Sequence, residues 1–193
     1  AYGRASQIIA SVTQVLKIME VARGSPAQFV RRFDPACDNS YLMEFRHRFN
    51  NGEDLACLIY WMRQAIEERG SLGDFFLMGY RPEESNLGPS ISRFVRNLLE
   101  LDRGPFFPSG LPALGQRVRY LLPTPEDGSA CKRLNLYLRW MVRRGDKLDF
   151  GLWRDISTSQ LVIPLDSHVS RIARYLGLTT CQSPSWKTAL EVT

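Results

Sequence analysis

The chain has 193 residues, of which 44% are hydrophobic, and it carries a formal net charge of +5 with a pI near 9.2. This composition excludes a disordered chain, and no apolar run approaches the roughly 18–20 residues of a membrane-spanning helix. The positive charge fits an anionic partner such as nucleic acid, although many basic proteins bind none.

Apolar residues recur at helical spacing along most of the chain. In chain order, the segments predicted to be helical are 5–22, 26–32, 53–69, 71–79, 88–102, 114–120, 128–144, 166–177 and 184–193. The other segments are a loop over 34–40, an ambiguous stretch over 43–51, a Gly- and Pro-rich loop over 103–113 and a long connector over 145–165. No stretch alternates like a strand, so the sequence predicts an all-α fold of short helices with long connections.

The segment 128–144, GSACKRLNLYLRWMVRR, predicts a helix with one basic face. At about 100° per residue, Lys132, Arg139 and Arg143 share one stripe. A solvated helix face explains this stripe, and so does a surface on which arginines bind phosphates. The place of Lys132 in the first turn favours the second interpretation, because the positive end of a helix disfavours a protonated amine and an amine nucleophile must lose its proton.

Residues 161–171, LVIPLDSHVSR, place an acid and a histidine directly after an apolar run. Asp166 precedes a helical pattern, so it fits the N-cap of that helix. A carboxylate held by backbone N–H groups also stays ionised and can stabilise positive charge, so capping and catalysis are compatible. His168 taken alone is more often a structural histidine, and Arg171 could pair with a carboxylate or contact a phosphate.

Two of these segments resemble segments of the helix-hairpin-helix DNA glycosylases. VIPLDSHVSRIARYLGL is similar to the segment that carries their catalytic aspartate, and Asp166, His168 and Arg171 match its motif. KRLNLYLRWMVRR is similar to the helix that carries the catalytic lysine of the bifunctional members, with Lys132 and Asn135 at the matching positions of a Lys-x-x-Asn pattern. Together with AYGR near the start and FGLW before the aspartate segment, they most resemble an uncharacterised bacterial family, a domain of unknown function related to those glycosylases.

The resemblance implies one all-α, helix-hairpin-helix glycosylase-like domain that continues beyond both ends of this sequence. Two helical lobes, roughly 1–120 and 121–193, would flank a cleft. The implied activity is that of a DNA glycosylase, with or without AP lyase activity, which excises a damaged base flipped from duplex DNA. Lys132 would be the amine that attacks the sugar C1′, and Asp166 would be the catalytic carboxylate.

The resemblance also implies a monomer that works on DNA in the bacterial cytoplasm, at the nucleoid, without a membrane partner. No cofactor or metal is expected. The four cysteines lie far apart and form no C-x-x-C pair, which argues against a zinc or iron–sulfur site and favours reduced, buried thiols.

Two features depart from the superfamily pattern. Its hairpin reads Leu-Pro-Gly-x-Gly, whereas LLPTPEDGSACK lacks the first glycine, so Gly128 and Ser129 are candidates to contact phosphate instead. The spacing of 34 residues from Lys132 to Asp166 is longer than in most members. Residues 144–160 must therefore loop out if the two side chains are to meet.

The predicted DNA contacts are Gly128, Ser129, Arg139, Arg143, His168 and Arg171. Trp153 is predicted to supply the aromatic face of a base pocket, although aromatic residues at such spacing more often belong to a core. Two other interpretations stay open. One is a nucleic-acid-binding helical module without catalysis, in which Asp166 is only a cap, and the other is a helical protein-interaction scaffold.

Overall fold

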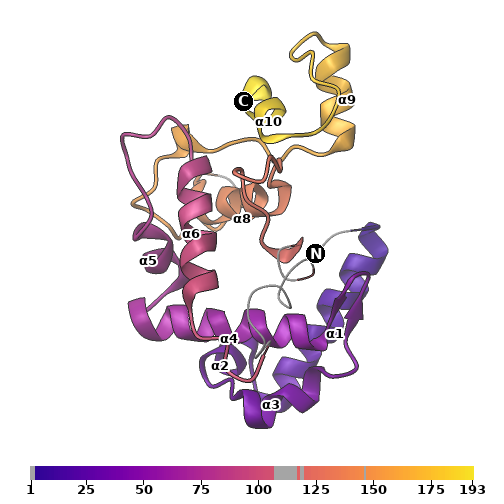
Figure 1. The fold of residues 1–193 in the computed structure, drawn as a ribbon, viewed down its shortest axis with the longest axis vertical. Coiled ribbons are helices and arrows are strands. Elements are labelled where there is room, and N and C mark those ends of the chain that lie inside the picture. Colours follow the sequence, from indigo (N-terminus) through magenta and orange to yellow (C-terminus); the bar gives the residue numbers. More distant parts are fainter. Residues whose placement is uncertain (1–2, 107–116, 118–119, 146) are drawn as a thin grey trace. The chain divides into compact units, whose positions relative to one another are not determined.

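The computed structural model describes residues 3–106, 117, 120–145 and 147–193, which are mostly helical, as the all-α prediction expects (Figure 1). The helices are α1 (Ala5–Arg23), α2 (Pro26–Arg31), α3 (Pro35–Leu42), α4 (Gly52–Arg69), α5 (Leu72–Leu77), α6 (Gly88–Glu100), α8 (Lys132–Val142), α9 (Ser167–Tyr175) and α10 (Trp186–Val192). The other elements are the short antiparallel strands β1 (Arg46–His47) and β2 (Asn50–Asn51) and the 3-10 turn η1 (Thr158–Gln160). Within the described part of the chain, no helix is long and apolar enough to cross a membrane.

The chain packs as two compact units. Unit 1 comprises Ala1–Phe75 and Leu98–Leu121, and unit 2 comprises Phe76–Asn97 and Leu122–Thr193. Residues 76–97, which the sequence interpretation put in the first lobe, therefore pack with the second unit.

Unit 1 is built around α4. The helices α2 and α3 lie against α4, and α1 packs on α2 and α3 (Figure 1). The largest buried side chains of this core are Phe29, Phe33, Leu42, Ile59, Trp61, Phe75 and Phe106. The predicted helix over 114–120 also belongs to this part of the chain, but it lies mostly outside the described residues.

Helix α3 replaces most of the loop predicted over 34–40. The Asp34 side chain accepts a hydrogen bond from the backbone N–H of Ala36, and Pro35 occupies the first helical position, which are both favourable at a helix start. The Asp38 carboxylate is buried and receives two hydrogen bonds from Arg23 of α1, at 2.8 and 2.9 Å. This ion pair between helices is a tertiary contact, which the local pattern of apolar residues does not reveal.

Helix α4 begins directly after the ambiguous stretch, which forms β1 and β2. The side chains of Asn51 and Asp54 make a capping box, each accepting from the backbone N–H of the other. Gly52 lies so close to α3 that an added Cβ would come within 1.8 Å of the carbonyl oxygen of Leu42. Only glycine therefore fits at this junction of α3 and α4.

All four cysteines are free thiols, but only some are buried. Cys57 and Cys131 are buried, Cys181 is partly buried and Cys37 is exposed, so the expectation of buried thiols is wrong for Cys37. That residue lies on the outer face of α3, which the sequence interpretation had treated as a loop.

In unit 2, the connector between α8 and α9 returns along α8 and is held to it. The backbone N–H groups of Phe150 and Gly151 donate to the carbonyl of Trp140, and that of Trp153 donates to the carbonyl of Met141. These bonds satisfy carbonyl groups that the end of a helix leaves without an internal partner. Residues 150–153 of the predicted connector are therefore bonded to the end of α8 within unit 2.

Further along the connector, the buried side chain of Gln160 is a second anchor. Its oxygen accepts a hydrogen bond from the Tyr80 hydroxyl at 2.6 Å. Its amide nitrogen donates to the carbonyl groups of Arg81, Pro82 and Glu84. These bonds tie the end of the connector to the segment before α6.

Candidate functional site

Lys132 and Asp166 meet at the starts of two helices of unit 2. Lys132 is the first residue of α8, and Asp166 is the N-cap of α9. The Nζ of Lys132 donates a hydrogen bond to Oδ2 of Asp166 at 2.9 Å. The lysine side chain is 48% exposed and the aspartate side chain 29%, so the ion pair is open to solvent. The two residues are in contact although 34 positions separate them.

An apolar cluster lies beneath both residues. Ala130, Val162, Leu165 and Ala189 are buried together, and Ile163, Val169 and Trp186 pack against them. Ala130 comes two residues before Lys132, and Leu165 comes directly before Asp166. Burial of these two neighbours in one cluster therefore holds the two backbone segments side by side, and the returning connector makes this possible.

The turn before Lys132 shortens the helix that the sequence predicts over 128–144. Cys131 has a left-handed backbone, with φ of 47°, so α8 begins at Lys132. The buried Asn135 donates from Nδ2 to the carbonyl of Ala130 at 3.1 Å and holds this turn against the helix. Asn135, which the sequence marks only as part of a motif, thus supports the start of α8.

One carboxylate oxygen of Asp166 caps α9, and the other oxygen faces Lys132. Its Oδ1 accepts hydrogen bonds from the backbone N–H groups of His168 and Val169, at 3.0 and 2.9 Å. The bond from Val169 and then the bond from Lys132 hold the pKa of the Asp166 carboxyl below its ordinary range. The carboxylate is therefore ionised at neutral pH, with Oδ2 facing the lysine. A group so placed can accept a proton from the amine or stabilise a nearby cation.

Cys131 lies next to Lys132 in sequence but is a poor nucleophile. Burial raises the pKa of its thiol to about 12, so the thiol is protonated at neutral pH. Its sulfur contacts the carbonyl oxygens of Pro123 and Ser129, at 3.4 and 3.3 Å. Over the described ranges, no group of three or more His, Cys, Asp or Glu side chains could hold a metal ion.

Arg139 and Arg143 converge on one buried carboxylate. The Nε of each arginine lies 3.4 Å from Oδ2 of Asp149, whose side chain is only 1% exposed. The predicted basic stripe is therefore divided, because Lys132 faces Asp166 while the two arginines face Asp149. Asp149 was not among the predicted site residues, because its burial depends on the return of the connector along α8.

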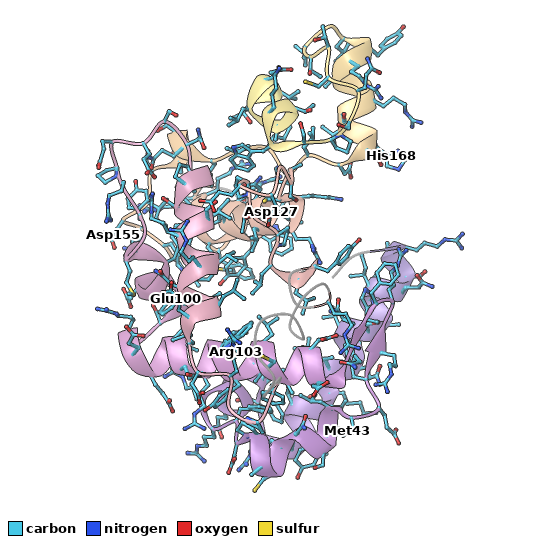
Figure 2. The ribbon with its side chains drawn as sticks, in the orientation of Figure 1. Met43, Glu100, Arg103, Asp127, Asp155 and His168 are labelled. Carbon is cyan, nitrogen blue, oxygen red and sulfur yellow. The ribbon has the colours of Figure 1, made fainter. Side chains whose placement is uncertain are left out.

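The other predicted DNA contacts lie near the starts of α8 and α9. The backbone N–H of Gly128 donates within its own turn, to the carbonyl three residues earlier, at 2.9 Å. The hydroxyl oxygen of Ser129 accepts from the backbone N–H of Cys131 at 3.1 Å. His168 and Arg171 are exposed, with 3.3 Å between His168 Nδ1 and the Arg171 guanidinium, and Figure 2 shows His168 at the start of α9. The DNA-binding roles of these four residues stay predictions.

Trp153 packs in the core of unit 2. Its ring centroid lies 5.4 Å from those of both Phe76 and Tyr137. The cavity beside it, of about 10 Å³, is lined by Phe76, Ile91, Phe94, Leu134, Tyr137, Leu138 and Trp153. Such a volume holds about one water molecule, far less than a nucleobase, so this cavity does not support the predicted base-pocket role.

A larger cavity, of about 230 Å³, lies in unit 1. Side chains of α1 and α4 form most of its apolar wall, and Ser11 and His47 contribute a hydrogen bond of 2.8 Å between Oγ and Nδ1. None of its lining residues was predicted as a site residue.

The comparisons identify a family and no characterised relative. A model of the family described as "Protein of unknown function (DUF2400)" matches residues 1–193, so the chain belongs to this family. No curated protein and no solved structure shows a significant match to the chain. The predicted membership of an uncharacterised family is therefore confirmed.

Proposed function

We propose that this member of the DUF2400 family is a DNA glycosylase with AP lyase activity, which excises a damaged base flipped out of duplex DNA. The observation that carries the proposal is the contact of 2.9 Å between Lys132 and Asp166 at two helix starts. An amine nucleophile and a carboxylate in hydrogen-bond contact are the groups that such an excision needs. The resemblance of both segments to the helix-hairpin-helix DNA glycosylases supports this activity and a two-lobed fold of that type.

The proposed reaction begins when Lys132 passes a proton to Asp166. A bond then forms between Nζ and C1′ of the sugar while the bond from C1′ to the base breaks, and the base leaves with the bonding electrons and takes up a proton. Opening of the sugar ring moves a proton from Nζ to O4′ and leaves an iminium between Nζ and C1′. Loss of a proton from C2′ to solvent then forms a double bond between C2′ and C3′, the 3′ phosphate leaves with the electrons of its bond to C3′, and the strand is cleaved. The proton that the leaving base takes up comes from Asp166, and the carboxylate restored in this way would stabilise the positive charge of the iminium.

The charge distribution supports DNA as the partner. Unit 2 holds thirteen Lys and Arg against nine Asp and Glu, a net charge of +4 out of the +5 of the whole chain. The excess is thus concentrated in the unit that carries Lys132 and Asp166. Cationic surfaces bind DNA by releasing the counterions of its phosphates, and we propose the nucleoid as the place of action.

Borohydride trapping tests the role of Lys132. Reduction of the iminium would join the protein covalently to a duplex that contains a damaged or abasic nucleotide, and a panel of single modified bases would identify the substrate. The expected result is trapping by the unchanged chain and no trapping by Lys132→Ala. Lys187→Ala is the control and should trap normally, because Lys187 is an exposed lysine of unit 2 outside the site. Equal trapping by Lys132→Ala would show that this residue is not the nucleophile, and no excision from any duplex would exclude the glycosylase.

A second candidate function is DNA binding without catalysis. It is favoured by the observation that capping of α9 alone accounts for both bonds to Oδ1 of Asp166. In that case the pair with Lys132 would be a surface ion pair of small energetic value. Replacement of Asp166 by asparagine separates the two functions, because asparagine also caps a helix but carries no charge.

A further inference from the structure

The connector after α8 exposes three large apolar side chains at alternate positions. Leu148, Phe150 and Leu152 are 78%, 67% and 68% exposed. These three side chains form the apolar ridge. At about 3.3 Å per residue the ridge is at most about 13 Å long. Large apolar side chains that are exposed so close together in the chain are typical of an interaction site.

The residues between and after the members of the ridge are held inward. The Asp149 carboxylate is buried against Arg139 and Arg143, and Trp153 packs on aromatic rings of the core. Gly151 has a φ of +61°, and an added Cβ would lie 2.8 Å from the side chain of Arg144, so no larger residue fits there. The apolar ridge faces outward because its neighbours are anchored on the other side.

The backbone of the apolar ridge is also held in place. The backbone nitrogens of Phe150 and Gly151 lie 2.7 and 3.1 Å from the carbonyl oxygen of Trp140. The backbone nitrogen of Trp153 lies 2.8 Å from the carbonyl oxygen of Met141. A partner would therefore meet a surface that is already ordered, which lowers the entropy cost of binding.

Exposed cations flank the apolar ridge. Arg144, Lys147 and Arg154 are exposed, and the ridge belongs to the unit that holds most of the net positive charge. The segment from 143 to 155 holds four Lys and Arg against three Asp, a net charge of +1, and Asp155, labelled in Figure 2, is the one exposed acid among its described residues. The fitting partner is therefore a polyanion that also offers apolar surface.

Duplex DNA has both properties, because its minor groove accepts apolar side chains between the sugars and base steps while its phosphates pair with Lys and Arg. We propose that the apolar ridge is a second DNA contact, packed in the minor groove, while Arg144, Lys147 and Arg154 bind the flanking phosphates. The choice of DNA rests on the proposed function. This contact comes from the connector, whereas the contacts predicted from the sequence lie mainly on α8, α9 and the turn before α8.

Binding of a short fluorescent duplex, measured by anisotropy over a range of salt concentrations, tests the ridge. The double variant Phe150→Ser/Leu152→Ser is expected to bind about tenfold more weakly, as for the loss of a central apolar contact. Its dependence of log Kd on log salt should not change, since apolar side chains release no counterions. Lys147→Ala should instead reduce that slope by about 1. Val21→Ser is the matched control, because Val21 is 79% exposed but lies on α1 of unit 1.

Unchanged affinity of the double variant, or an equal loss for Val21→Ser, would overturn the proposal. So would a double variant that loses self-association in sedimentation while it binds DNA normally, since the ridge would then be a protein contact. The test measures binding and not turnover, so it is separate from the test of the activity. Ridge-dependent binding without excision would contradict only the proposed glycosylase activity. Excision with ridge-independent binding would contradict only the proposed DNA contact of the ridge.

Discussion

Replacement of Asp166 by asparagine is expected to abolish turnover while the fold and DNA binding persist. The two carboxylate oxygens have different partners, because Oδ1 caps α9 and Oδ2 pairs with Lys132. Asparagine keeps an acceptor for the cap, which it forms about as well as aspartate. It loses the negative charge and turns a donor toward the ammonium. The substitution therefore removes the chemistry of the pair and keeps the helix start.

The expected loss of stability is small. With side chains 48% and 29% exposed, the ion pair is screened by solvent and contributes about 0.2–1 kcal/mol. For a chain of this size, a loss of about 1 kcal/mol lowers the Tm by about 2–4 °C. Loss of a proton-transfer group, by contrast, lowers a rate by about 10²–10⁴-fold. The two effects differ enough in size to be measured separately.

The assay compares excision, DNA binding and urea denaturation for the same set of variants. Ser185→Ala is the matched control, because Ser185 is the N-cap of α10 in the same unit and lies outside the ion pair. It should lose about 1 kcal/mol of stability and keep its turnover. An Asp166→Asn variant that turns over at the normal rate would refute the catalytic role and leave the cap as the whole explanation.

The difference in stability between the unchanged chain and Asp166→Asn should also depend on pH. The folded-state pKa of Asp166 is depressed, so the carboxylate adds stability above its unfolded value of about 3.9. This contribution is lost as the pH falls through the lower, folded value. The difference in unfolding free energy between the unchanged chain and Asp166→Asn should be constant from neutral pH to about pH 5 and should vanish in more acidic solution. A difference that instead grew on acidification would contradict this assignment.

Two further substitutions test the packing around the site and in unit 1. Asp149→Asn should lower the free energy of unfolding in urea by about 1–3 kcal/mol, because it leaves two arginines facing a neutral buried group. The control Glu126→Gln, whose pair with Arg96 is exposed, should change that free energy by no more than about 0.5 kcal/mol. Equal losses would show that the burial of Asp149 adds nothing to stability. Gly52→Ala should lower the Tm clearly, by the equivalent of about 1–3 kcal/mol, because its Cβ would strike the carbonyl of Leu42, and an unchanged Tm would mean that α3 and α4 separate without cost.

Local features of the sequence were enough to predict most helices and several of their ends. Asp166 was predicted to cap the helix that follows it and it does, because a cap involves only its own side chain and backbone groups two or three positions later. Gly24 and Gly70 likewise end α1 and α4, each with a positive φ that glycine adopts readily. Lys132 and Asp166 could be selected as candidates from the residue types and the motifs around them.

Contacts between distant residues were decided by the tertiary structure. Lys132 reaches Asp166 only because Ala130 and Leu165 are buried in one apolar cluster. Asp149 is buried only because the connector returns along α8. Such contacts join residues 10 to 34 positions apart, and their geometry depends on the packing of the whole unit rather than on local periodicity or capping. The sequence by itself therefore determined where most helices lie and which side chains are candidates for the site, whereas packing determined which of those side chains meet.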